Sequence, residues 1–201
     1  MSMPKGENIN HPKKGSTIKV EPIKNPKDIE TIKKLLYKNL RNYTLFVLGI
    51  NTNLRASDLC NITVGQVKGL NPMDEIELKE KKTDKIRRIT LNKACTDAIQ
   101  RLLASRPYQD EQPLFLSQRG YNSLKPNSIN KLVKQWCKAI NLKGNYGSHS
   151  LRKTWGYHQR VKYNVGIPEL MVCFNHSTQK QTLDYLCIQP EEIKSVYTNE
   201  I

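Results

Sequence analysis

The sequence predicts a mainly helical domain with one small antiparallel β-hairpin, an α+β fold. Apolar residues recur at helical spacing along most of the chain, and the period shortens to that of strands only between Glu75 and Leu91. The length of 201 residues, with 37% hydrophobic and 25% charged residues, suits one globular domain with a short arm. We find no internal repeat.

The first 25 residues differ in composition from the rest of the chain. They carry Pro4, Pro12 and Pro22 with two glycines among lysines and asparagines. Such a composition buries little surface, so a flexible basic arm or linker is expected over residues 1–25. The folded domain is then expected over residues 26–201.

The helices of this domain are predicted from stripes of apolar residues and from start signals. Asn25-Pro26-Lys27-Asp28 opens the first helix, because asparagine caps a helix and proline suits its first turn. The third helix starts at Arg55, after the break at Asn51-Thr52-Asn53. The predicted helices cover about 25–36, 42–50, 55–61, 93–105, 127–140, 150–163, 167–174, 179–188 and 190–197.

Two short β-prone runs form the predicted hairpin. They cover residues 76–78 and 86–91, and the polar, lysine-rich segment 79–85 between them forms its tip. A further short strand is expected at 114–116.

The charge balance favours a polyanionic partner. The chain has 33 Lys and Arg against 18 Asp and Glu, a net charge of +15. Such an excess attracts nucleic acid and favours binding through counterion release, although a basic tail or a need for solubility would give the same composition.

Other classes of protein are disfavoured. No stretch approaches the roughly 20 apolar residues that span a bilayer, and residues 1–19 hold no apolar core of a signal peptide. We therefore expect the protein to stay inside the cell, in the cytoplasm. The five cysteines are scattered without any CxxC pair, which predicts free thiols and no zinc or other metal site.

Three segments carry residues suited to phosphate chemistry. In the first, Arg55 lies at a predicted helix start, where backbone N–H groups already favour an anion, and Asp58 could hold it in place. In the second, His149 and Arg152 lie one helical turn apart. In the third, His176 precedes a helix that carries Tyr185. Each alone has a plainer explanation: a surface ion pair, a chance HxxR, and a core tyrosine.

In chain order, these residues resemble the active-site signature of the tyrosine recombinase (phage integrase) family. Residues 48–59 resemble its T-G-L-R-x-S-E-L box, 148–156 its H-x-L-R box, and 174–185 its L-G-H…T…Y box. The resemblance spans about residues 25–200 and implies the catalytic-domain fold of that family. The positions that match its catalytic residues are Arg55, Lys82, His149, Arg152, His176 and Tyr185.

Two positions depart from the family pattern. Asn53 and Asn175 stand where the family usually has glycine. Because asparagine is the commonest non-glycine residue with a left-handed backbone, we expect both to keep the same turns.

The resemblance implies a role for each residue. Arg55 and Arg152 would clamp the nonbridging oxygens of a scissile DNA phosphate while Tyr185 attacks the phosphorus. Lys82 on the hairpin would protonate the leaving 5′-oxygen, with Lys81 and Lys85 as weaker candidates. His149 would accept the tyrosine proton, and His176 would bind a phosphate oxygen.

The resemblance therefore implies a site-specific recombinase that cuts and rejoins double-stranded DNA, needs no cofactor, and works as a homo-oligomer, a tetramer. The family usually has a DNA-clamping domain ahead of the catalytic one, so the chain is expected to be a catalytic fragment or a short recombinase such as the fimbrial phase-switch invertases. A catalytically silent DNA-binding regulator and a topoisomerase of type IB remain alternatives. The segment after Tyr185, residues 190–201, would either dock onto a neighbouring protomer or cap its own domain.

Overall fold

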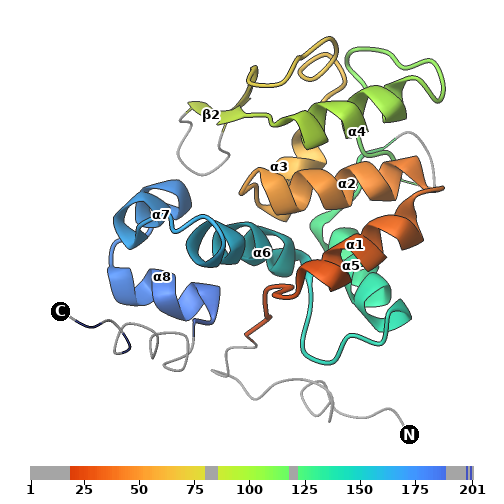
Figure 1. Cartoon of the computed structure of the whole chain (residues 1–201). Helices are drawn as coiled ribbons and strands as arrows, with labels where there is room; N and C mark the ends of the chain where they lie inside the picture. Colours follow the sequence, from red (N-terminus) through yellow and green to blue (C-terminus); the bar gives the residue numbers. More distant parts are fainter. Residues whose placement is uncertain (1–18, 80–85, 118–121, 189–197, 199, 201) are drawn as a thin grey trace, which may run out of the picture.

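Eight helices and a two-stranded sheet make up the part of the chain described in the computed structural model, which comprises residues 19–79, 86–117, 122–188, 198 and 200 (Figure 1). The elements are α1 (Pro26–Leu36), α2 (Leu40–Asn51), α3 (Ala56–Asn61), β1 (Glu75–Lys79), β2 (Ile86–Thr90), α4 (Lys93–Leu103), α5 (Pro126–Ala139), α6 (Ser148–Val161), α7 (Ile167–Phe174) and α8 (Gln179–Leu186). The mainly helical fold with one antiparallel hairpin is confirmed.

Local sequence signals account for the ends of several helices. The Asn25 side chain accepts a hydrogen bond from the backbone N–H of Lys27 at 2.9 Å and caps α1. Asn175 ends α7 in the left-handed conformation, with φ of 57°. Cys187 caps α8 in the same way, with φ of 56°, so the helix ends at Leu186, two residues before the predicted end.

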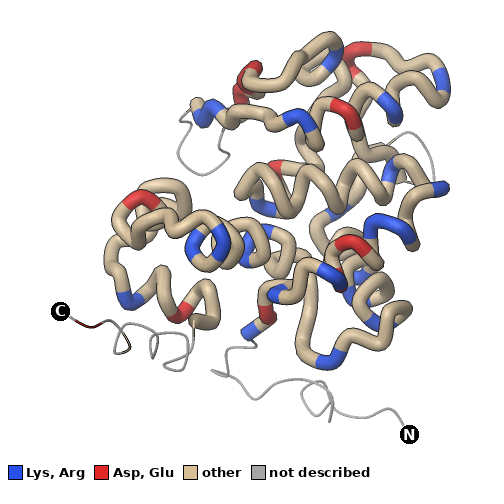
Figure 2. Tube along the Cα trace, in the orientation of Figure 1, with Lys and Arg blue, Asp and Glu red and all other residues tan. Residues whose placement is uncertain are grey.

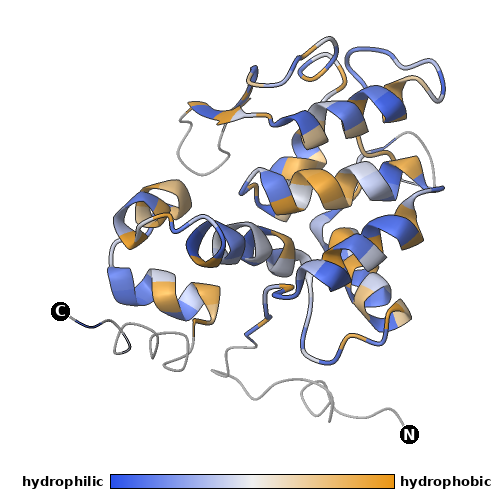
Figure 3. Ribbon diagram, in the orientation of Figure 1, coloured by the Kyte–Doolittle hydropathy of each residue, from blue (hydrophilic) through white to orange (hydrophobic). Residues whose placement is uncertain are grey.

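The main hydrophobic core lies between helices α1 to α5, the sheet and one face of α6. Apolar residues are concentrated along α2, whose Leu45, Phe46 and Leu48 are fully buried (Figure 3). Helix α6 packs against α2 and α5 on one side and against α8 on the other. It thereby connects the main core to the α7–α8 pair.

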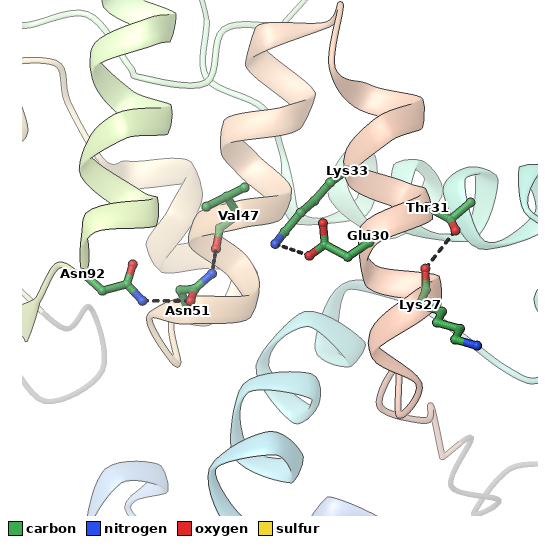
Figure 4. Close-up of polar contacts among 7 residues, drawn as sticks. All are labelled: Lys27, Glu30, Thr31, Lys33, Val47, Asn51 and Asn92. Carbon is green, nitrogen blue, oxygen red and sulfur yellow. Dashed lines mark hydrogen bonds and ion pairs between the residues drawn. The ribbon is translucent and has the colours of Figure 1, made fainter. Parts of the chain in front are cut away.

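Asn51 and Asn92 connect the last turn of α2 to the start of α4 (Figure 4). The Asn51 amide donates to the carbonyl of Val47 at 2.8 Å, and its oxygen accepts from the Asn92 amide at 2.9 Å. Asn92 also caps α4 by accepting from the backbone N–H of Cys95. These bonds support the chain just before the turn that leads to Arg55.

Residues 19–25 are packed against the domain, although the sequence predicted an arm or linker as far as residue 25. Ile23 is buried, its N–H donates to Thr154 Oγ1 at 2.8 Å, and its carbonyl lies 3.0 Å from Nε2 of His158. The predicted arm at residues 1–18 lies outside the described residues. Two apolar residues, Val20 and Ile23, among polar ones gave too weak a signal to reveal this packing.

Two further expectations concern short elements. The strand expected at 114–116 does not form. In this segment, Leu116 makes an isolated antiparallel bridge to Ser123. The helix predicted at 190–197 lies outside the described residues. Within the described part of the chain, no helix is long and apolar enough to cross a membrane.

Candidate active site

The turn between α2 and α3 positions Arg55. Asn53 has the left-handed backbone that was expected of it, with φ of 55°, and Arg55 follows as the N-cap of α3. The Asp58 carboxylate accepts a hydrogen bond from the backbone N–H of Arg55 at 3.0 Å. Asp58 thus holds Arg55 through its main chain, in line with the predicted pairing of the two residues.

Helix α6 carries His149 and Arg152 in its first two turns. Arg152 is only 5% exposed, and two hydrogen bonds fix its guanidinium. Nε donates to Oδ1 of Asn53 at 2.8 Å, and Nη2 donates to the carbonyl of Phe174 at 3.2 Å. His149 lies near the start of the helix and is exposed.

The α7–α8 pair carries His176 and Tyr185. The left-handed Asn175 turns the chain so that His176 stacks on Phe174, with ring centroids 5.2 Å apart. Nδ1 of His176 lies 3.0 Å from Oγ1 of Thr182, and its ring centroid lies 5.1 Å from that of Tyr185. The α7–α8 pair therefore places the imidazole of His176 in contact with the phenol ring of Tyr185.

The two arginines converge on the same groups. The positive charges of Arg152 and Arg55 both act on the phenol of Tyr185 and on the imidazoles of His149 and His176. Burial lowers the pKa of Arg152 to about 10, which still leaves the guanidinium charged at neutral pH. The structure thus brings five of the six predicted residues together.

The phenol of Tyr185 is held in its neutral form. Its oxygen is buried and has no hydrogen-bond partner among the described residues. Burial raises the pKa of Tyr185 and outweighs the opposing effect of Arg152 and Arg55. The two cations favour the ionised phenol, but their effect on its pKa is smaller than that of desolvation.

Both histidines are neutral at physiological pH. Desolvation lowers the pKa of His149, and the positive charges of Arg152, Lys153 and Arg55 add to this effect. The pKa of His176 is lowered by desolvation and then by Arg152 and Arg55. A neutral imidazole has a free lone pair, so His149 is able to accept a proton.

A pocket of about 590 Å³ opens beside the tyrosine. Its wall includes His149, His176 and Tyr185, and it is completed by the start of the described chain at Lys19 and Val20. This places space for a ligand directly next to the phenol and both imidazoles.

Two basic residues of the site were not predicted from the sequence. Lys153 is 5% exposed, and its Nζ lies 4.8 Å from the ring centroid of Tyr185. Arg87 on β2 donates from Nη2 to the carbonyl of Cys173 at 3.1 Å, and its charge acts on Arg152. Because Lys153 adjoins Arg152 in the sequence, its place in the site could have been predicted. No feature of the sequence around Arg87 indicated that this residue belongs to the site.

The remaining predicted residue, Lys82, lies outside the described residues, as do Lys81 and Lys85. The strands that flank them are paired from Glu75↔Thr90 to Lys79↔Ile86. No group of three or more His, Cys, Asp or Glu able to hold a metal ion occurs within the described ranges.

Sequence comparison decides the family of this chain. The family model described as "Phage integrase family" matches residues 25–192. The chain belongs to this family. A curated relative, the probable integrase/recombinase YoeC of Bacillus subtilis (strain 168), is 33% identical over 184 residues, covering 89% of this chain and 95% of the relative. The predicted membership among the tyrosine recombinases is confirmed.

Solved structures of recombinases share the fold. The XerA recombinase aligns with a TM-score of 0.72 and 18% identity, over 89% of this chain and 65% of XerA. XerH bound to a palindromic difH substrate in a post-cleavage complex also gives 0.72 and 18%, over 91% of this chain and 54% of XerH. The chain thus spans between about half and two thirds of the length of these recombinases. At 18% identity, the match shows the fold alone.

Proposed function

We propose that this tyrosine recombinase carries out site-specific recombination of double-stranded DNA by cutting and rejoining strands through a 3′-phosphotyrosyl intermediate at Tyr185. The observation that carries the proposal is the convergence of the Arg55 and Arg152 charges on the Tyr185 phenol, beside two neutral imidazoles. A core tyrosine has no need of two guanidinium groups, whereas in-line attack on a phosphodiester requires them.

Each group has a defined part in the reaction. The Tyr185 oxygen forms a bond to phosphorus as the bond from phosphorus to the 5′-oxygen breaks. Arg55 and Arg152 stabilise the charge that accumulates on the nonbridging oxygens, and His176 binds one of them. The same steps in reverse rejoin a strand, and the phosphotyrosyl bond conserves the energy for this step, so no ATP is consumed.

Two proton transfers accompany the exchange. His149, neutral because its pKa is lowered, accepts the proton of the Tyr185 phenol. Lys82 supplies the proton that the departing 5′-oxygen needs. Because burial raises the pKa of Tyr185, the phenol is protonated at neutral pH, and its proton must be removed as it attacks the phosphorus.

The distribution of charge supports a DNA partner. Lys and Arg lie on α6, which carries His149 and Arg152, and on β2, whose Arg87 contacts the carbonyl of Cys173 (Figure 2). Over the whole chain, 33 Lys and Arg outnumber 18 Asp and Glu. We propose that the protein acts as a tetramer on DNA in the cytoplasm, associated with the nucleoid. Residues 190–201 would either dock onto a neighbouring protomer or cap their own domain.

The covalent intermediate is the direct test of this function. A duplex with a nick beside the cleavage site loses the short cut strand, so the enzyme remains attached and migrates as a larger species on a denaturing gel. The duplexes are drawn from the DNA flanking the gene. We expect the adduct with the native chain and none with Tyr185→Phe.

A second buried tyrosine provides the matched control. Tyr146 is buried outside the pocket and donates its hydroxyl to the carbonyl of Lys143, so Tyr146→Phe should still form the adduct. DNA binding without any adduct would instead indicate a silent regulator. Relaxation of supercoiled DNA without exchange between two sites would indicate topoisomerase activity.

A further inference from the structure

Asn53 makes two hydrogen bonds that no glycine could make at this position. Its side chain is buried, with the residue 2% exposed. Oδ1 accepts from Nε of Arg152 at 2.8 Å, while Nδ2 donates to the carbonyl of Cys173 at 2.7 Å. Both the oxygen and the nitrogen of the amide are therefore hydrogen-bonded, the oxygen to a residue of α6 and the nitrogen to a residue of α7.

The chemistry of the partners fixes the orientation of this amide. The Nε of an arginine can only donate a hydrogen bond, and a backbone carbonyl can only accept one. The Asn53 oxygen must therefore face Arg152, and its nitrogen must face Cys173. A flipped amide would lose both bonds, so the contact selects a single orientation.

Backbone conformation alone does not explain the side chain at this position. Asn175 has nearly the same left-handed φ, 57° against 55° for Asn53. Asn175 is exposed, however, and within the described part of the chain no hydrogen bond of its side chain is found. The left-handed turn accounts for Asn175, whereas Asn53 has in addition a buried amide with two specific partners.

The two bonds connect three parts of the site. Arg152 donates from Nη2 to the carbonyl of Phe174, and Asn53 donates to the preceding carbonyl, that of Cys173. The turn before Arg55, the start of α6 and the carboxyl end of α7 are therefore tied together around one guanidinium. The end of α7 at Phe174 is followed by its C-cap Asn175 and then by His176.

We propose that Asn53 is a positioning residue for the phosphate clamp: it holds the Arg152 guanidinium by its Nε edge and fixes the end of α7 beside it. This inference rests on the proposed function. With Nε and one Nη2 hydrogen engaged by the protein, the remaining N–H groups of Arg152 are directed to the phosphate. The side chain thus converts a flexible cation into one with a fixed orientation before DNA binds.

Asn53→Gly is the test, because glycine keeps the left-handed turn and removes only the amide. Single-turnover cleavage of the nicked duplex is measured at saturating DNA, together with the dissociation constant for the same DNA. Misplacement of a reacting group by about 1 Å can cost on the order of 100-fold in rate. We therefore expect cleavage to slow by about 10- to 100-fold, with DNA affinity changed by less than about threefold.

Asn175→Gly is the matched control, since it is the same substitution in the same backbone conformation without the buried bonds. It should cleave within about twofold of the native rate. Thermal unfolding of both variants shows whether they are folded at the assay temperature. If Asn53→Gly is not folded, Asn53→Asp replaces it, because aspartate also tolerates this conformation but cannot donate to Cys173.

A double-mutant cycle separates positioning from a general structural effect. Arg152→Lys keeps a positive charge but lacks Nε, so Asn53→Gly should cost less than about threefold in that background. Equal losses in both backgrounds, or a native rate for Asn53→Gly, would overturn the inference. These results differ from a failure of the proposed function, in which the native chain itself forms no adduct.

Discussion

The two hydrophobic clusters of this molecule differ in size and in what they carry. The main cluster is built from helices α1 to α5, the sheet and Leu151 of α6, and it supports the turn that holds Arg55. The second cluster has three buried side chains among the described residues, and Tyr185 is packed on its edge. These three are Leu170, Phe174 and Leu186.

This difference separates the clamp from the nucleophile. The cations of Arg55 and Arg152 are placed by a large core and by the buried amide of Asn53. The phenol and His176 are placed by two eight-residue helices that bury little apolar surface. Local stability follows the number of buried apolar contacts, so α7 and α8 should open more readily than the rest of the domain.

Matched leucines test this comparison with the largest expected effect. Leu186 in α8 and Leu45 in α2 are both 0% exposed, and each truncation to alanine should cost about 2–5 kcal/mol. Leu45→Ala should lower the stability of the whole domain, measured by urea unfolding. Leu186→Ala should mainly speed amide hydrogen exchange in α7 and α8 and reduce adduct formation. Uniform exchange in both variants would show that the two clusters unfold as one unit.

Substitution of two glycines, each at a contact between helices, tests the same comparison with a smaller expected loss of stability. A Cβ on Gly156 would clash with Phe174 and lie 2.7 Å from Cδ2 of Leu186, whereas one on Gly49 would lie 2.6 Å from Cδ1 of Leu151. Overpacking of this kind costs about 1–3 kcal/mol. Gly156→Ala should release α7 and α8 and slow cleavage, while Gly49→Ala should lower the melting temperature. The reverse pattern would contradict the assignment of the two contacts.

The pH dependence of stability is expected to be the smallest effect. The folded state lowers the pKa of His149 and His176, so the unfolded chain binds protons more readily below pH 6.5. The contribution of the two histidines to the free energy of unfolding should be constant above pH 6.5. It should fall as the pH decreases below 6.5. Scanning calorimetry at pH 7.5 and 5.5 measures the loss.

The double variant His149→Gln with His176→Gln provides the reference for this measurement. It retains all carboxylates, whose titration then cancels in the comparison. Between these two pH values, the native melting temperature should fall slightly further than that of the double variant, and the difference should be small because His149 is exposed. An equal fall in both proteins would exclude the two histidines as the cause.

The sequence alone determined the order of the elements, because apolar spacing and caps such as Asn25 act over a few residues. It also determined the left-handed turns at Asn53 and Asn175, where residue type restricts the backbone. The six candidate residues came from a match of motifs in chain order. The fold brings five of these residues together.

Only the tertiary structure decided how those residues are held. The bond from Asn53 to Arg152 joins residues 99 positions apart, and Ile23 meets Thr154 across 131 positions. The burial that raises the pKa of Tyr185 likewise depends on neighbours distant in the chain. Local patterns hold no information about such partners, since these contacts exist only once the helices have packed.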